Sequence, residues 1–298
     1  MSAATSASRR VTTHVCWPVE DYDLDATLDC GQAFRWTRTD DGWAGVVAGR
    51  WIKLRNDGDA IQAETVVPQA DWLWLAEYLQ VDVVLNEIVK TFPDDAPLRD
   101  AVAACRGLRL LRQEPWECLA SFILSSTKQI LQIRQIVELL CQRFGEALPA
   151  QPGTATTFSF PLPERIARAT ESELRACKMG FRAPHLLAAA RAVAKGRLDL
   201  TRLRALPLPE ARERLMRLDG VGPKIADCVL LFACGFAQAF PVDVWVERAL
   251  RQLYFCHRRV PPAKLREFTA SHFGPNAGYS QQYLFHFIRT RGAQKLSG

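Results

Sequence analysis

The sequence predicts an α+β fold, in which a small antiparallel β domain packs on a larger helical domain. Between residues 30 and 67, short runs rich in β-branched and aromatic residues alternate with turn sequences such as DDG and NDGD, which is typical of an antiparallel meander. After Pro68, apolar residues recur at helical spacing. We therefore expect a β domain with following helices over 12–112 and a helical domain over 113–298.

The expected elements follow in chain order. The meander predicts strands over 32–37, 43–47, 51–55 and 60–67, and helices follow over 72–79 and 81–92. Pro115 opens a helix with an apolar stripe, and the polar SSTKQ segment at 125–129 interrupts it before a second helix that ends near Phe144. Beyond a loop at 154–163, further helices fit residues 164–169, 171–177, 184–195, 209–217, 224–233, 243–254, 263–272 and 277–290.

The composition is that of an ordinary soluble globular protein, because 48% of the 298 residues are hydrophobic and 23% are charged. No apolar run approaches the roughly 18 residues that a membrane helix needs, so we expect no membrane partner. The first ten residues, MSAATSASRR, lack the apolar stretch of a secretory signal. We expect residues 1–11 to be a disordered tail on an intracellular monomer, located in the cytoplasm or nucleoid of a bacterium or in the nucleus of a eukaryote.

The nine cysteines are odd in number and include no C-x-x-C pair. This pattern favours free thiols in a reducing compartment over a disulfide framework or a zinc ribbon. An iron–sulfur cluster would normally need closely spaced ligands. We therefore expect the protein to use neither a metal nor a cofactor.

The net charge of +6 is unevenly distributed, since residues 164–224 carry 14 Lys and Arg against 7 Asp and Glu, and residues 251–298 carry 8 against 1. A basic half beside an acidic remainder is expected of a protein that binds a polyanion such as nucleic acid. Solvated helix faces would explain the same charges equally well, so charge alone does not decide.

The segment LMRLDGVGPKIADCVLLFA at 215–233 predicts two helices joined by a tight turn. Gly220 and Gly222 allow the turn and leave backbone N–H groups open to a phosphate, although glycine also ends many helices for conformational reasons alone. Lys224 falls at the start of the second helix, where the helix dipole disfavours an ammonium and so favours the nucleophilic amine. Asp243 precedes the next amphipathic helix, where N-capping alone would explain it.

In combination, the L-x-G-V-G-x-K hairpin and the following P-V-D sequence resemble the DNA glycosylases of the helix-hairpin-helix superfamily. The resemblance narrows to 8-oxoguanine DNA glycosylase/lyase, whose blocks are matched in order by CGQAFRW at 30–36, LLRQEPWECLASFILSS at 110–126, MGFRAPHLLAAARAV at 179–193 and GPNAGYSQQYLF at 274–285. It implies a β domain of TATA-box-binding-protein-like form, packed on two helical subdomains, with the active site in the cleft.

The resemblance implies a chemical role for two residues. Lys224 would attack C1′ of the damaged nucleoside and form a Schiff base with the opened sugar, so that β-elimination can follow base loss. Asp243 would stabilise the positive charge that develops on the sugar, assist proton transfer and cap its helix.

A base pocket follows from helical spacing and from the resemblance. Gln281 and Phe285 are four residues apart on a predicted helix and share one face, as do Lys224 and Cys228. An amide can read a base edge and a ring can stack on it, although Phe285 would also suit a hydrophobic core. The resemblance implies that Cys228 and Phe285 sandwich the extruded base while Gln281 pairs with its Watson–Crick edge. The resemblance also implies a role for the backbone carbonyl of Gly31, which would accept N7–H of 8-oxoguanine and repel N7 of guanine.

Outside this pocket, Phe181 matches the family's wedge, which fills the gap left by an extruded base, and Arg182 matches an arginine that recognises the estranged cytosine. The chain departs from its better-known relatives at Thr127, in place of the first of three asparagines, and at Gln132, in place of an arginine. The sequence therefore leaves the preference for cytosine open. Trp245 stands where a histidine often meets phosphate.

Three hypotheses remain at this point. The first is a bifunctional glycosylase/lyase that acts on double-stranded DNA containing oxidised guanine, and the second is a glycosylase for alkylated or other damaged bases. The third is a non-catalytic duplex-binding module, which would have no need for the Lys224 and Asp243 pair. The pair therefore favours an enzyme, and a comparison of 8-oxoguanine with an alkylated purine would separate the first two hypotheses.

Overall fold

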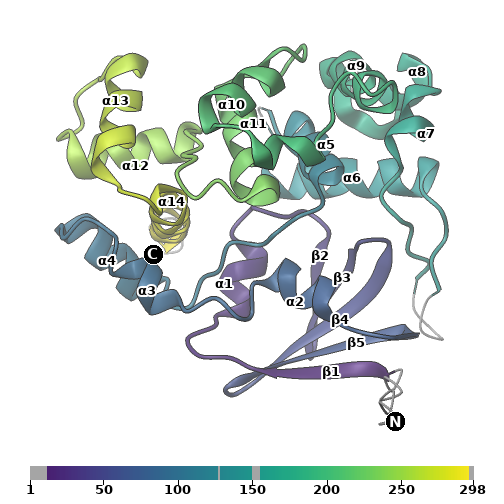
Figure 1. Ribbon diagram of the computed structural model, residues 1–298, viewed down its shortest axis with the longest axis horizontal. Helices are drawn as coiled ribbons and strands as arrows, with labels where there is room; N and C mark the ends of the chain where they lie inside the picture. Colours follow the sequence, from purple (N-terminus) through teal and green to yellow (C-terminus); the bar gives the residue numbers. More distant parts are fainter. Residues whose placement is uncertain (1–11, 127, 150–154, 295–298) are drawn as a thin grey trace, which may run out of the picture.

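The computed structural model describes residues 12–126, 128–149 and 155–294 (Figure 1). The predicted tail at 1–11 and Thr127 lie outside the described residues. An antiparallel five-stranded sheet occupies one end of the molecule, and helices build the rest (Figure 1). The predicted α+β class is confirmed.

The sheet has the spatial order β1-β5-β4-β3-β2. Its strands are β1 (Thr12–Pro18), β2 (Trp36–Thr39), β3 (Gly42–Val47), β4 (Arg50–Asp57) and β5 (Ala60–Gln69). Strands β2 to β5 form the predicted meander, whereas β1 was not predicted and pairs with the outer edge of β5. The expected strand at 32–37 begins only at Trp36, because the buried side chain of Gln32 donates to the carbonyls of Thr27 in α1 and of Arg109, and so holds this segment outside the sheet.

An aromatic and aliphatic core fills the space between the sheet and α2 (Leu73–Leu79). Its fully buried members include Trp36, Ile52, Leu54 and Ile61. The indole of Trp36 donates to the hydroxyl of Tyr78 at 2.8 Å, so that burial leaves this polar group satisfied. The core fixes the start of β2 and, with it, the loop that carries Gly31.

The remaining helices are α1 (Leu24–Asp29), α3 (Leu85–Val89), α4 (Ala96–Ala104), α5 (Pro115–Leu124), α6 (Ile130–Phe144), α7 (Pro163–Ala167), α8 (Glu171–Leu174), α9 (Ala183–Ala194), α10 (Leu208–Met216), α11 (Pro223–Val229), α12 (Val244–Tyr254), α13 (Pro262–His272) and α14 (Ala277–Gln294), with single turns η1 (Arg175–Met179), η2 (Gly180–Arg182), η3 (Thr201–Ala205) and η4 (Leu230–Cys234).

Most predicted helices are present, and the break expected at 125–129 separates α5 from α6. Three differ from expectation. The helix predicted over 81–92 is limited to α3 (Leu85–Val89), because the chain turns after Gln80, whose φ is positive. The helix predicted over 171–177 ends at Leu174, and the chain then turns through Lys178 and Gly180, both with positive φ. The helix predicted over 224–233 is α-helical to Val229 and ends in the π turn η4. The short helices α1 and α4 were not predicted.

Helix α14 lies between the sheet end and the helices around α11 and α12 (Figure 1). It packs against α4 on one side and α12 on the other, and α5 packs against α11. The main hydrophobic core is continuous from α1 to α14, so residues from both ends of the sequence meet at its centre. None of the helices in the described ranges is long and apolar enough to cross a lipid bilayer.

Candidate active site

A cavity of about 350 Å³ lies where the loop after α1 meets α5, α6, α11, α12 and α14. Its volume is in the range, roughly 300 to 1,000 Å³, of pockets that bind small molecules. The two predicted catalytic residues and the four predicted base-binding residues line it, namely Gly31, Lys224, Cys228, Asp243, Gln281 and Phe285, and so does Trp245. The structure therefore brings the predicted catalytic pair and the predicted base-binding residues into one cavity.

The hairpin between α10 and α11 presents Lys224 to this cavity. Gly220 has a φ of +80°, and a Cβ there would lie 2.5 Å from the ring of His185, so the turn requires glycine. Gly222 is the N-cap of α11, and a Cβ there would meet nothing within 4 Å, so packing does not require glycine at this position. An ion pair of 2.7 Å between Arg212 Nε and Asp227 Oδ1 holds α11 against α10.

Lys224 is the second residue of α11, as predicted, and its amine contacts the end of α5. Nζ donates to Ser125 Oγ at 3.0 Å and lies 5.0 Å from the centre of the Phe122 ring. The hydroxyl proton of Ser125 is committed to the carbonyl of Phe122 at 2.7 Å, so Oγ acts as the acceptor. Once Lys224 is in its amine form, it can still donate an N–H to Ser125 while its lone pair is available to an electrophile. The sequence pointed to the SS pair only as a helix break and missed this contact.

Asp243 is both a helix cap and a cavity residue. Its Oδ1 accepts from the backbone N–H groups of Trp245 at 3.0 Å and Val246 at 2.8 Å, at the N-terminus of α12. Both bonds use the same oxygen, so capping does not consume Oδ2. Burial raises the pKa of Asp243, while the two N–H donors and the nearby Lys224 ammonium oppose that rise.

The other residues of the cavity form a slot for a flat group. Gln281 is 4% exposed, and its Oε1 is buried without a hydrogen-bond partner among the described residues. Burial raises the pKa of the Cys228 thiol to about 12, so this side chain is neutral. Gly31 has a φ of +80°, and a Cβ there would lie 2.8 Å from Ile130 Cδ1 and 3.6 Å from Phe285 Cε1. Any side chain at position 31 would therefore narrow the slot.

The residues predicted to contact DNA outside the cavity differ in their exposure to solvent. Phe181 is 57% exposed, as a wedge requires. Arg182 differs from expectation, because it is 2% exposed and donates to the carbonyls of Met179 and Ser126. In this structure it supports the turn around 178–180 and lies 4.3 Å from the Phe181 ring centre, rather than facing an opposite base. Gln132 is exposed and its Oε1 accepts from the N–H of Gln129 at 3.2 Å.

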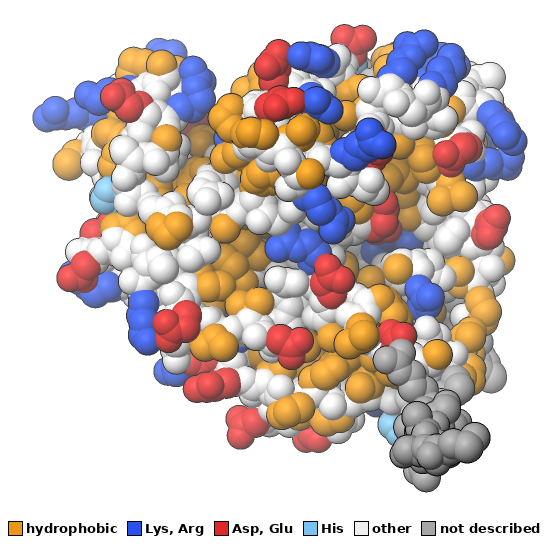
Figure 2. Space-filling view, viewed as in Figure 1, with side chains coloured by type: hydrophobic (Ala, Val, Ile, Leu, Met, Phe, Trp, Pro, Cys, Tyr) orange, Lys and Arg blue, Asp and Glu red, His pale blue; other side chains and the backbone are white. Residues whose placement is uncertain are grey.

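Lys and Arg side chains gather over α7 to α9 and over α13, whereas Asp and Glu side chains are more frequent over the half that holds the sheet (Figure 2). This agrees with the uneven charge of the sequence and places much of the positive charge on the helical part. In the described ranges, no group of three or more His, Cys, Asp or Glu is placed to hold a metal ion.

A hairpin that delivers an amine to a cavity shared with a capping carboxylate and a slot for a flat group is the arrangement of a helix-hairpin-helix DNA glycosylase. Family comparisons agree with this class. The 8-oxoguanine DNA glycosylase N-terminal domain matches residues 15–119, and the HhH-GPD superfamily of base excision DNA repair proteins matches residues 120–275.

Similar proteins cover nearly the whole chain. The probable N-glycosylase/DNA lyase of Methanothermobacter thermautotrophicus is 30% identical over 304 residues, covering 92% of this chain and 96% of the relative. The solved structure of MBOgg1 in complex with a low-affinity DNA ligand is 32% identical, with a TM-score of 0.89, and the match covers 95% of this chain and 99% of that one. The 8-oxoguanine glycosylase/lyase of Clostridium acetobutylicum, in complex with double-stranded DNA containing cytosine opposite 8-oxoguanine, is 29% identical with a TM-score of 0.86, covering 93% and 98%. The chain belongs to the HhH-GPD superfamily and, within it, to the 8-oxoguanine DNA glycosylase family.

Proposed function

We propose that the protein extrudes 8-oxoguanine from double-stranded DNA, releases the base and then cleaves the strand at the same site. The observation that carries this proposal is the placement of Lys224 and Asp243 in one cavity with Gly31, Gln281 and Phe285. An amine and a carboxylate at a single base slot are what covalent base release requires, whereas a protein that only binds duplex DNA needs neither. Extrusion is necessary because C1′ cannot be reached inside the duplex.

The reaction begins at the sugar of the extruded nucleotide. Lys224 Nζ attacks C1′ as the bond from C1′ to the base breaks, and the bonding electron pair leaves with the base, which takes up a proton. The carboxylate of Asp243 stabilises the positive charge that develops on the sugar, and the burial of this side chain strengthens the electrostatic interaction. Nζ then loses a proton, and its lone pair forms the C=N bond of the Schiff base as the C1′–O4′ bond breaks. The electron pair of that bond stays on O4′, which takes up a proton.

Strand cleavage uses the same covalent intermediate. The Schiff base acidifies C2′, and removal of a C2′ proton expels the 3′-phosphate by β-elimination. Water hydrolyses the remaining Schiff base and returns Lys224 to its amine form. Ser125 contributes by holding Nζ at 3.0 Å in the resting site, so that the amine is directed before DNA arrives.

The base is recognised by a polar group of the slot that has no hydrogen-bond partner among the described residues. A buried acceptor without a partner costs about 1 to 3 kcal/mol, and Gln281 Oε1 accepts from none of the described residues. The Watson–Crick edge of 8-oxoguanine carries N1–H and exocyclic N–H donors that can satisfy it, and an acceptor O6 that can take the Gln281 amide N–H. The ring of Phe285 and the thiol of Cys228 enclose the two faces of the base.

Borohydride trapping tests the proposed nucleophile. Wild-type protein should be trapped covalently on a duplex that contains 8-oxoguanine, because borohydride reduces the Schiff base. Lys224→Gln should abolish the trapped species. Lys128→Gln is the matched control, since Lys128 also lines the cavity, and this variant should still be trapped. A Lys224→Gln protein that is trapped as well as the wild type would refute the assignment, and faster release of an alkylated purine than of 8-oxoguanine would refute the proposed lesion.

A further inference from the structure

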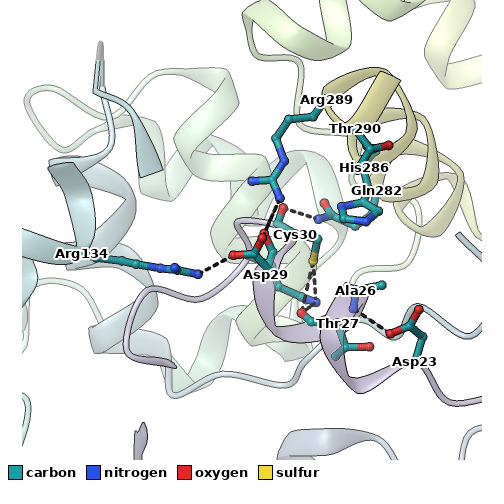
Figure 3. Close-up of polar contacts among 11 residues, drawn as sticks. Asp23, Ala26, Thr27, Asp29, Cys30, Arg134, Gln282, His286, Arg289 and Thr290 are labelled. Atoms are coloured by element: carbon teal, nitrogen blue, oxygen red, sulfur yellow. Dashed lines mark hydrogen bonds and ion pairs between the residues drawn. The ribbon is translucent and has the colours of Figure 1, made fainter. Parts of the chain in front are cut away.

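Two arginines from different helices hold Asp29, the last residue of α1, two positions before Gly31 (Figure 3). Arg289 of α14 donates from one terminal nitrogen to the Asp29 carbonyl oxygen at 2.5 Å and to Oδ2 at 3.4 Å. Arg134 of α6 donates to Oδ1 at 2.9 Å. We call Asp29, Arg134 and Arg289 the Asp29 clamp. It joins the end of α1 to two helices that form walls of the cavity.

Side chains hold the backbone on both sides of Gly31. The carbonyl of Cys30 accepts from Gln282 Nε2 at 3.0 Å, and the carbonyl of Gln32 accepts from Gln113 Nε2 at 2.6 Å. Together with the Asp29 carbonyl, three of the four carbonyls from 29 to 32 are thus bound by side-chain donors. The fourth, that of Gly31, has no hydrogen bond to a described residue, and Gly31 lines the cavity.

Arg289 also contacts the opposite wall of the base slot. Its guanidinium carbon lies 5.9 Å from the centre of the Phe285 ring. The Arg289 side chain therefore donates a hydrogen bond to the backbone before Gly31 and also packs on the Phe285 ring, which faces Gly31. Because a Cβ on Gly31 would lie 3.6 Å from Phe285, a small shift of either wall would change the slot.

Binding of DNA phosphate is the simpler explanation for two arginines near this opening. The geometry argues against it, since both guanidiniums are already paired with Asp29 and their side chains are only 25% and 21% exposed. A cation that serves a phosphate is usually free to reach it. An arginine that is fixed by a carboxylate and a carbonyl instead restrains the backbone that it binds.

We propose that Asp29, Arg134 and Arg289 are positioning residues that set the discrimination between 8-oxoguanine and guanine. This rests on the proposed function, in which the Gly31 carbonyl faces N7 of the base. The two bases differ there in a single hydrogen, which only 8-oxoguanine carries. The Gly31 carbonyl can accept from N7–H of 8-oxoguanine and repel N7 of guanine only while its orientation is fixed. The clamp supplies that restraint by holding the backbone before Gly31, and Arg289, which also lines the cavity, ties this backbone to the wall that carries Phe285.

The test compares two substrates on the same variants. Release of 8-oxoguanine depends on the Gly31 carbonyl, whereas β-elimination at an abasic site in the same duplex needs Lys224 but has no base to read. Arg289→Met should lower the single-turnover rate on 8-oxoguanine about tenfold or more relative to the rate on the abasic duplex, as expected when one hydrogen-bonded restraint in a recognition site is lost. The abasic rate should stay within about twofold, which also shows that the variant is folded.

Arg134→Met should have a smaller effect in the same direction, because Arg134 binds only the carboxylate of Asp29. Asp29→Asn combined with Arg289→Met should cost less than the product of the single effects, as expected of residues that act through one contact. Arg55→Met is the matched control. It removes pairs with Asp41 and Glu64 at a 36% exposed side chain in the sheet, and the ratio of the two rates should not change.

Two results would overturn the inference. One is an unchanged ratio in Arg289→Met, above all if the salt dependence of duplex binding falls by about one ion, which would assign Arg289 to phosphate. The other is an equal loss on both substrates, which would make the clamp a general support of the fold. Failure of wild-type protein to release 8-oxoguanine, with intact cleavage of the abasic duplex, would instead refute the proposed function and the inference with it.

Discussion

The base slot and the surface around Phe181 differ in how their residues are held. Four residues of the slot form pairs one helical turn apart, on α11 and on α14, and a fifth is the cap of α12. The surface around Phe181 is built from the irregular turns η1 and η2 and from the break between α5 and α6. In a regular helix, the spacing of residues in the sequence determines which side chains share a face, whereas in an irregular turn it does not. We therefore expect substitutions in the slot to reduce activity strongly and substitutions around Phe181 to have smaller effects.

The largest expected effect tests the chemistry of the slot. Asp243→Asn keeps the N-cap, because Asn caps as well as Asp, but it removes the negative charge. Base release should fall about 10² to 10³-fold, in line with the loss of one group that stabilises a charged transition state. Single-turnover kinetics measure the fall, and thermal melting should show little change. A melting temperature that drops together with the activity would mean that Asp243 is mainly structural.

A second test separates recognition from stability. Gln281→Leu replaces an amide whose buried Oε1 has no partner among the described residues with an apolar side chain of similar size. Release of 8-oxoguanine should fall about 10 to 100-fold, because the base then loses its partner, while the protein should be as stable as the wild type or more so. Denaturant unfolding and excision rates would be measured on the same preparation. Lower stability in this variant would show that Oε1 has a partner in solution.

The third test is the acid dependence of the slot. Burial raises the pKa of Asp243, so base release should decline on acidification at a higher pH than an ordinary aspartate would give, by about tenfold per pH unit below that pKa. Acidification should have the opposite effect on the stability of the fold. A carboxyl whose pKa is raised by folding favours the folded state when it is protonated. This group therefore contributes stability below its unfolded pKa and loses that contribution as the pH rises through its folded pKa. A decline in activity that coincides with acid unfolding would contradict this assignment.

The smallest expected effect is on the opposite base. Because Arg182 is buried against two backbone carbonyls, Arg182→Met should lower stability by about 1 to 3 kcal/mol and leave the ranking of the four opposite bases within about threefold. Excision from four duplexes that differ only opposite the lesion gives the ranking. Loss of a cytosine preference in this variant would show that the guanidinium turns outward when DNA binds.

Sequence reasoning recovered the parts of the molecule that depend on local spacing. The hairpin, the pairs on α11 and α14 and the break before α6 all follow from residues a few positions apart. It missed β1, although Val15 and Trp17 alternate with the more exposed His14 and Cys16, because the strand exists only through pairing with β5, far along the chain. Pairing partners of that kind are set by tertiary packing rather than by local pattern.

The same limit explains the missed parts of the site. Ser125 meets Lys224 across 99 residues, and Asp29 meets Arg289 across 260. Neither contact has a motif of its own. Arg182 shows the converse case. Its position matches a block of the family, but its side chain turns inward and donates to the carbonyls of Met179, at the end of η1, and Ser126, just after α5.

The neutral thiol of Cys228 has a consequence for survival under oxidative stress. Peroxides attack thiolates, and a thiol with a pKa of about 12 that is 3% exposed is almost never in that form at neutral pH. The slot can therefore keep a sulfur atom against its ligand without becoming a target of the oxidants that generate 8-oxoguanine. Cys228 should therefore be oxidised more slowly by peroxide than the exposed thiols of Cys16 and Cys256.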